Sequence, residues 1–139
     1  MRSEDEPVLQ DESVGRLIWI DYFKPQLDLI VQPGAFEPRK NETDGISVFR
    51  LACLSDPRDI LAIIAVEKQP KYAIAVLPVV DLSTLGLTVQ PAKIETVPGH
   101  AVLPELNIVN YQADKPRCKT VQKQLAEIAS RNIVHRPAI

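Results

Sequence analysis

The sequence predicts an α+β fold: a single domain with a mostly antiparallel or mixed sheet of five to seven short strands and two main helices. The composition, 45% hydrophobic and 24% charged in 139 residues, is typical of a folded domain. The 12 prolines against 5 glycines keep the elements short, because proline ends helices and strands. The predicted helices, at about 56–66 and 119–132, are too few to connect the strands of a parallel sheet.

Short apolar runs between turn residues predict the strands. Residues 15–23 (GRLIWIDYF) are rich in β-branched and aromatic side chains, which favour strands. Residues 46–51 alternate between two faces, and residues 72–79 are apolar nearly throughout, which is typical of a central strand. Residues 107–111 also have the composition of a strand. Trp19, Tyr22 and Phe23 are expected to belong to the core.

Two segments carry the signals of helices. Asp56 and Pro57 predict a helix start, because an aspartate can accept from free backbone N–H groups and proline suits the first helical position. Apolar residues at 60–64 then predict a largely covered helix. The second helix is predicted by apolar spacing on one face, at Val121, Leu125, Ile128 and Asn132.

Charge is distributed unevenly along the chain. Residues 1–13 hold five acids and one arginine, and we interpret them as a mobile acidic arm before a single domain at 14–139. The formal charge of the whole chain is -2, which excludes the large positive surplus of a generic polyanion binder. A nucleic-acid partner is weakly supported, because the basic C-terminal part lacks interleaved aromatic residues. One interpretation of the basic part is a solvated helix face and tail. The other is a docking surface, on which an acidic partner contacts Lys115, Arg117, Lys119 and Lys123.

Cysteine and histidine usage predicts no metal and no cofactor. Cys53 and Cys118 are far apart and form no Cys-x-x-Cys pair, so we expect free thiols in the cytoplasm. Two histidines are too few for an all-histidine zinc site, and glycine-rich nucleotide motifs are absent from the sequence. No apolar run has the length of a membrane span, and the acidic first residues do not resemble a secretory signal.

The segment 98–107 combines several reactive side chains between prolines. His100, Glu105 and Asn107 place an imidazole, a carboxylate and an amide close together in a stiff stretch, as a preorganised site requires. The structural alternative is that Pro98 and Gly99 form a turn and that the polar side chains satisfy nearby backbone groups.

Arg50 is the second candidate, because an arginine in an apolar strand is costly to bury without an anionic partner. A structural ion pair is one interpretation, with Asp44, Glu67 or Asp81 as the partner. An anionic ligand is the other. Cys53 precedes the predicted helix start at Asp56, where a thiol could act as a nucleophile. A buried structural thiol is the interpretation that we favour.

Two functional hypotheses follow, and the sequence does not decide whether the protein is an enzyme. The first is a small cytoplasmic protein-binding module of the immunity, antitoxin or accessory-subunit type. The second is an enzyme acting on a nucleotide or nucleic-acid end, through ADP-ribosyl or phosphate chemistry. Arg50 would then hold phosphate, His100 would act as general acid or base, and Glu105 would orient it, which requires all three in one cleft. The oligomeric state is open, and assembly through a strand edge is a third, weaker reading.

Overall fold

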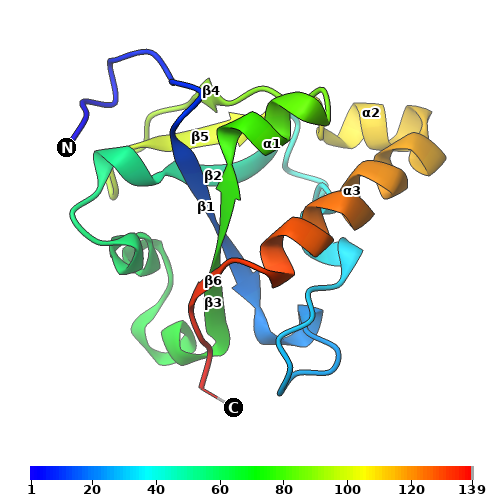
Figure 1. Cartoon of the computed structure of the whole chain (residues 1–139), viewed down its shortest axis with the longest axis horizontal. Coiled ribbons are helices and arrows are strands. Elements are labelled where there is room, and N and C mark those ends of the chain that lie inside the picture. The colour runs from blue at the N-terminus through cyan, green and yellow to red at the C-terminus, as the bar shows by residue number, and fades with distance from the viewer. Residues whose placement is uncertain (139) are drawn as a thin grey trace.

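The computed structural model describes residues 1–138; Ile139, the last residue of the predicted domain, lies outside the described residues. Within this range six strands form one antiparallel sheet, in the order β4-β5-β2-β1-β3-β6 (Figure 1). The strands are β1 (Ser13–Trp19), β2 (Ile46–Arg50), β3 (Tyr72–Pro78), β4 (Gln90–Pro91), β5 (His100–Leu103) and β6 (Ile133–His135). The α-helices are α1 (Val79–Thr84), α2 (Ile108–Ala113) and α3 (Lys115–Ser130). The predicted α+β class is confirmed.

Five short 3-10 helices complete the secondary structure of residues 1–138. They are η1 (Ile20–Tyr22), η2 (Pro33–Phe36), η3 (Leu51–Cys53), η4 (Pro57–Ile63) and η5 (Val66–Lys71). None of the helices over this range combines the length and the apolar character that crossing a bilayer requires.

β1 pairs with its two neighbouring strands over very different lengths. β1 pairs with β3 over its whole length, from Ser13 opposite Pro78 to Trp19 opposite Tyr72. With β2 it pairs at only two positions, Val14 opposite Arg50 and Gly15 opposite Phe49. β1 and β2 therefore separate toward the Trp19 end of β1. This separation shapes the candidate site described below.

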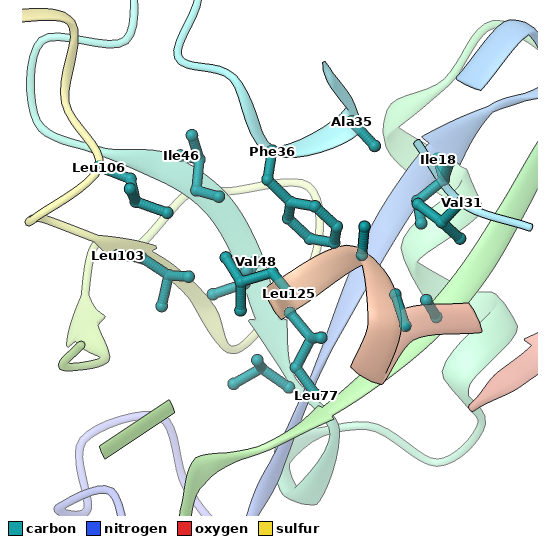
Figure 2. Close-up of a cluster of buried hydrophobic side chains, with 14 of the residues drawn as sticks. Ile18, Val31, Ala35, Phe36, Ile46, Val48, Leu77, Leu103, Leu106 and Leu125 are labelled. Carbon is teal, nitrogen blue, oxygen red and sulfur yellow. The ribbon is translucent and has the colours of Figure 1, made fainter. Parts of the chain in front are cut away.

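The main core lies between one face of the sheet and α3 (Figure 1). Leu125 of α3 points toward Val48 and Leu77 of the strands, and Phe36 closes the cluster beside them (Figure 2). These side chains are fully buried. One face of the sheet is thus covered by a long helix that packs along it.

The opposite face of the sheet carries a smaller core. There η4 contributes the buried Ile60, which clusters with Phe49 and Ile74 of the strands. The 3-10 helix η4 also borders a hollow near Trp19, because Ile63 at its end lines that hollow.

The segment predicted as a helix at 56–66 is a 3-10 helix over a shorter range, Pro57–Ile63. Its start is as predicted, because Asp56 accepts from the Arg58 amide at 2.8 Å. The side-chain amide of Gln69 donates to the carbonyls of Leu61 and Ile64, both at 3.0 Å. These bonds satisfy carbonyl groups at the end of η4 and favour a turn at Ile64 in place of a continued helix.

The C-terminal helices also differ from the prediction. Residues 107–111, predicted as a strand, begin α2, because Asn107 accepts from the Asn110 amide at 2.7 Å and caps the helix. α3 starts four residues before the predicted 119, where Asp114 caps it and Pro116 occupies its first turn. A cap selects a helix over a strand when the composition alone is ambiguous.

Candidate functional site

Arg50, the predicted phosphate ligand, is fully buried and binds the N-terminal segment instead. Nε and Nη2 each donate to the Glu12 carboxylate at 3.0 Å. Nη1 donates to the carbonyl of Glu6 at 2.8 Å, and Nη2 to that of Pro7 at 3.2 Å. The hydrogen bond with Glu12 raises the pKa of Arg50. Its role in the structure is an internal ion pair.

The partner of Arg50 is none of the three acids expected from the sequence, which were Asp44, Glu67 and Asp81. Glu12 holds this position because Val14, two residues farther along the chain, lies opposite Arg50 in the β1–β2 register. A carboxylate just before β1 therefore meets the guanidinium at the end of β2.

The N-terminal segment makes further contacts with the domain. Arg2 N–H donates to the Ala52 carbonyl at 2.8 Å, and the Glu4 carboxylate accepts from the Gly99 amide at 2.8 Å. Asp5 forms an ion pair with Lys93. The expected mobility of residues 1–13 concerns dynamics and stays a prediction; the contacts give that segment a defined place in this structure.

His100 lies on the other face of the sheet from Arg50. It is paired with Phe49 in the β2–β5 register, and the two rings meet edge to face at 5.1 Å. Consecutive strand residues point to opposite faces, so Arg50 faces away from both. The His100 ring nitrogens contact the Ala92 carbonyl at 2.5 Å and the Ser47 hydroxyl at 3.1 Å.

Glu105 and Asn107 serve local structure. Glu105 accepts from the amide and the hydroxyl of Thr88, at 2.9 and 2.7 Å. Asn107 caps α2 and donates to the Pro104 carbonyl at 2.9 Å. Neither is bonded to His100 or Arg50 within residues 1–138. The structure therefore does not bring the residues of the enzyme hypothesis into one cleft.

Cys53 and the basic segment complete the predicted sites. Cys53 is buried, and this burial raises the pKa of its thiol, which opposes thiolate formation. The four basic residues predicted to bind a partner are exposed on α3, on the side of the sheet opposite His100: Lys115, Arg117, Lys119 and Lys123. Lys115 lies 5.8 Å above the Tyr111 ring. Over residues 1–138, no group of three His, Cys, Asp or Glu side chains is arranged to hold a metal ion.

A hollow of about 480 Å³ lies where β1 and β2 separate, and the sequence analysis did not identify it. We call it the Trp19 hollow. The chain has one Trp, three Tyr and three Phe, and four of these seven aromatic residues line it. Its aromatic lining is Trp19, Tyr22, Phe49 and Tyr72; its polar lining is Arg16, Arg39, Asn41, Glu42 and Ser47; its apolar lining is Leu17, Ala35, Ile63 and Ile64.

No family model, no curated protein and no solved structure matches this chain. The chemistry of the Trp19 hollow must therefore be deduced from its own residues.

The aromatic wall of the hollow is fixed by strand pairing. Trp19 and Tyr72 lie opposite each other at the ends of β1 and β3, and their rings meet edge to face with centroids 5.1 Å apart. Both side chains are half-buried. Of the residues expected in the core, Phe23 is buried there, whereas Trp19 and Tyr22 line the hollow.

Arg16 reaches into the gap between the separated strands. Its Nη1 donates to the Ser47 carbonyl of β2 at 2.7 Å, and its Nη2 and Nε donate to the Ala35 carbonyl at 2.8 and 3.3 Å. Burial lowers the pKa of Arg16, the Glu42 carboxylate opposes this effect and the Arg39 charge adds to it. A half-buried cation thus lies in the lining of the hollow with carbonyl groups, and no carboxylate, as its hydrogen-bond partners in residues 1–138.

Glu42 and Arg39 form the polar rim. Glu42 accepts from the backbone amides of Arg39 and Ser47, at 2.9 and 3.3 Å, so both its oxygens stabilise the loop before β2. Arg39 donates to the Tyr22 hydroxyl and lies 5.2 Å from the centre of that ring. The rim therefore presents an exposed guanidinium next to an aromatic surface.

A second hollow of about 430 Å³, which includes His100, adjoins the first. The two share Asn41, Glu42 and Ser47 in their linings. Of the predicted site residues, His100 is the one that this second hollow contains.

Proposed function

We propose that this chain is a protein-binding module whose Trp19 hollow holds an acidic segment of a partner protein, with an apolar side chain of that segment against Trp19. The single observation that carries the proposal is the gathering of four of the seven aromatic residues and two arginines in one hollow. Trp, Tyr and Arg are the residue types that dominate binding energy at protein interfaces.

Charge supports an acidic partner segment. Arg16 and Arg39 face one carboxylate, Glu42, which already accepts two backbone N–H bonds. The hollow is thus locally positive, although the chain carries a formal charge of -2. Complementary charge favours a partner segment with carboxylates and disfavours a basic one.

The rigidity of the lining also supports a binding role. Trp19, Phe49 and Tyr72 belong to neighbouring strands in the middle of the sheet, so their backbone positions are held by hydrogen-bonded neighbours. A preorganised surface loses little conformational entropy when a ligand binds. The hollow therefore needs no folding step to become competent.

The proposal includes a cytoplasmic location, supported by the two free, buried thiols of Cys53 and Cys118. An immunity, antitoxin or accessory-subunit role is compatible with it, because such proteins act by binding another protein. The exposed cations of α3, notably Lys119 and Lys123, are proposed as a second contact on the opposite side of the sheet.

A selection from short random peptides tests the function. We expect peptides bound by the wild-type chain to be enriched in Asp and Glu next to an apolar residue. The Trp19→Ala and Tyr72→Ala variants, checked for folding by circular dichroism, should lose at least roughly tenfold in affinity, as truncation of an interface aromatic does. Val109→Ser is the matched control, since Val109 is an apolar residue of α2 that is 64% exposed.

Two results would contradict the proposed function. One is a selection without any enrichment for acidic residues. The other is a set of acidic peptides whose affinity is unchanged in folded Trp19→Ala, or lost equally in the Val109→Ser control.

A further inference from the structure

The guanidinium of Arg16 has hydrogen-bonding capacity that the protein does not use. Each terminal nitrogen of an arginine carries two N–H groups. Nη1 makes one bond, to the Ser47 carbonyl, and Nη2 makes one, to the Ala35 carbonyl. One N–H on each nitrogen therefore has no acceptor among residues 1–138, in a side chain that lines the Trp19 hollow.

The two carbonyl acceptors fix the guanidinium in place. The Ser47 carbonyl belongs to β2, and the Ala35 carbonyl belongs to η2, so the group is anchored to two elements at once. The Phe36 ring, 5.9 Å from the guanidinium carbon, supports it from the core side. An arginine anchored in this way keeps its guanidinium plane fixed, and a fixed plane favours recognition of a planar anion.

Among residues 1–138, Arg16 forms no direct ion pair with a carboxylate. By contrast, Arg50, which is fully buried where Arg16 is half-buried, has the Glu12 carboxylate at 3.0 Å. Glu42 is the carboxylate that acts on Arg16, but its oxygens accept the Arg39 and Ser47 amides. A cation that is partly or fully withdrawn from water is stabilised by an anionic partner. For Arg50 that partner is internal, and for Arg16 the open hollow is the place for one.

We propose that Arg16 is the anion subsite of the Trp19 hollow, where it binds a single carboxylate of the partner segment while Trp19 and Tyr72 contact the apolar group beside it. This inference rests on the proposed function and adds the chemical class that the hollow selects. Arg39 at the rim contributes long-range attraction; it is a positioning residue, because its contact is with Tyr22.

Small probes test the subsite without knowledge of the partner. N-acetylphenylalanine offers one carboxylate beside an apolar ring. In N-acetylphenylalanine amide a neutral carboxamide replaces that carboxylate. We expect the acid to bind about tenfold more tightly than the amide, because hydrogen bonds to a charged group are the stronger ones. Nuclear magnetic resonance should show the acid shifting the Arg16 Nε–H and Trp19 indole signals.

Substitutions then separate charge from geometry. Arg16→Lys keeps the charge but loses the fork, so the preference for the acid should fall several-fold. If that variant does not fold, Arg39→Ala, which removes an exposed positive side chain at the rim, should weaken binding of the acid more than binding of the amide. Inorganic phosphate tests the other oxyanion class and should compete only weakly with the acid.

Each contrary result has a distinct meaning. If the Trp19 signal gives equal affinities for the acid and the amide, Arg16 is not an anion subsite, although the hollow still binds the probes. Phosphate binding more tightly than the acid overturns the carboxylate assignment. Failure of both probes to bind overturns the subsite too, while selected acidic peptides that still require Trp19 would keep the proposed function.

Discussion

Arg50 and Glu12 form a bidentate ion pair in the interior, with two bonds of 3.0 Å between the guanidinium and the carboxylate. The Arg50 side chain is fully buried, and that of Glu12 is 3% exposed. This pair joins the end of β2 to the segment before β1. Arg50 is therefore a structural arginine, whereas Arg16 lines a hollow.

Breaking this pair should destabilise the fold. Glu12→Gln leaves the Arg50 charge buried without an anion, and we expect the free energy of unfolding to fall by about 3 kcal/mol. Denaturant unfolding followed by Trp19 fluorescence measures it. Glu127→Gln is the matched control, because Glu127 is exposed on α3. Equal stability of the two variants would show that the pair contributes nothing to the fold.

The same pair predicts an acid-sensitive stability. Burial raises the pKa of Glu12, but the Arg50 hydrogen bond, the Leu9 amide and the nearby arginine charges outweigh it, so the net pKa is lowered. As the pH falls, the Glu12 carboxylate therefore binds a proton at a higher pH in the unfolded chain than in the folded chain. The stabilisation is complete above the ordinary glutamate pKa of about 4.3 and is lost as the pH falls through the lower value in the folded state.

Unfolding measured across this pH range tests the linkage. The stability difference between wild type and Glu12→Gln should narrow as the solution is acidified. Asp56, whose pKa is held at about 2 by its hydrogen bonds with Arg58, titrates equally in both proteins and cancels in the difference. A difference that stays constant down to strong acid would mean that Glu12 is not the group responsible.

Gly45, at the start of β2, should not tolerate a side chain. Its φ is +129°, and a Cβ there would lie 2.3 Å from the Leu103 carbonyl oxygen. We expect Gly45→Ala to cost about 2 kcal/mol of unfolding free energy, from backbone strain and steric overlap. Gly86→Ala is the comparison, since its φ is +78° with nothing within 4 Å of the added Cβ. A larger loss at Gly86 would contradict the close approach at Gly45.

Much of the fold was predictable because its signals are local. β2 and β3 were expected at 46–51 and 72–79, and the structure places them at Ile46–Arg50 and Tyr72–Pro78. The alternating pattern of apolar residues and the positions of the prolines predicted the ends of these strands to within a few residues. The strand predicted at 107–111 was wrong, because the capping hydrogen bond that Asn107 accepts favours a helix over the strand that the composition suggests.

The candidate site was not predictable, because it depends on long-range register. His100, Glu105 and Asn107 are neighbours in the sequence, yet they are bonded to Ser47, Thr88 and the α2 backbone respectively. The Trp19 hollow gathers residues from three strands, from the 3-10 helices η1, η2 and η4, and from the loop before β2. It exists because β1 and β2 pair at two positions and then separate, and no local pattern in Arg16 or Trp19 encodes that separation.

The basic face of α3 is proposed as a second contact for a whole partner protein, and a short peptide held in the Trp19 hollow should not reach it. Lys119→Glu combined with Lys123→Glu reverses two exposed charges on the side of the sheet away from the hollow. We expect acidic peptides to bind this variant within about twofold of wild type, because distant surface charges are screened by salt. Calorimetric titration measures it. A loss of binding would move the interface to α3.

The most direct measurement of the central claim is the emission of Trp19, the one tryptophan in the sequence, during titration with a selected acidic peptide. If the peptide binds in the Trp19 hollow, we expect a saturable change in Trp19 emission with the same midpoint as the calorimetric binding curve. In Arg16→Lys we expect the midpoint at a higher peptide concentration. Saturable binding by calorimetry with no change at Trp19 would place the partner elsewhere on the protein and contradict the account.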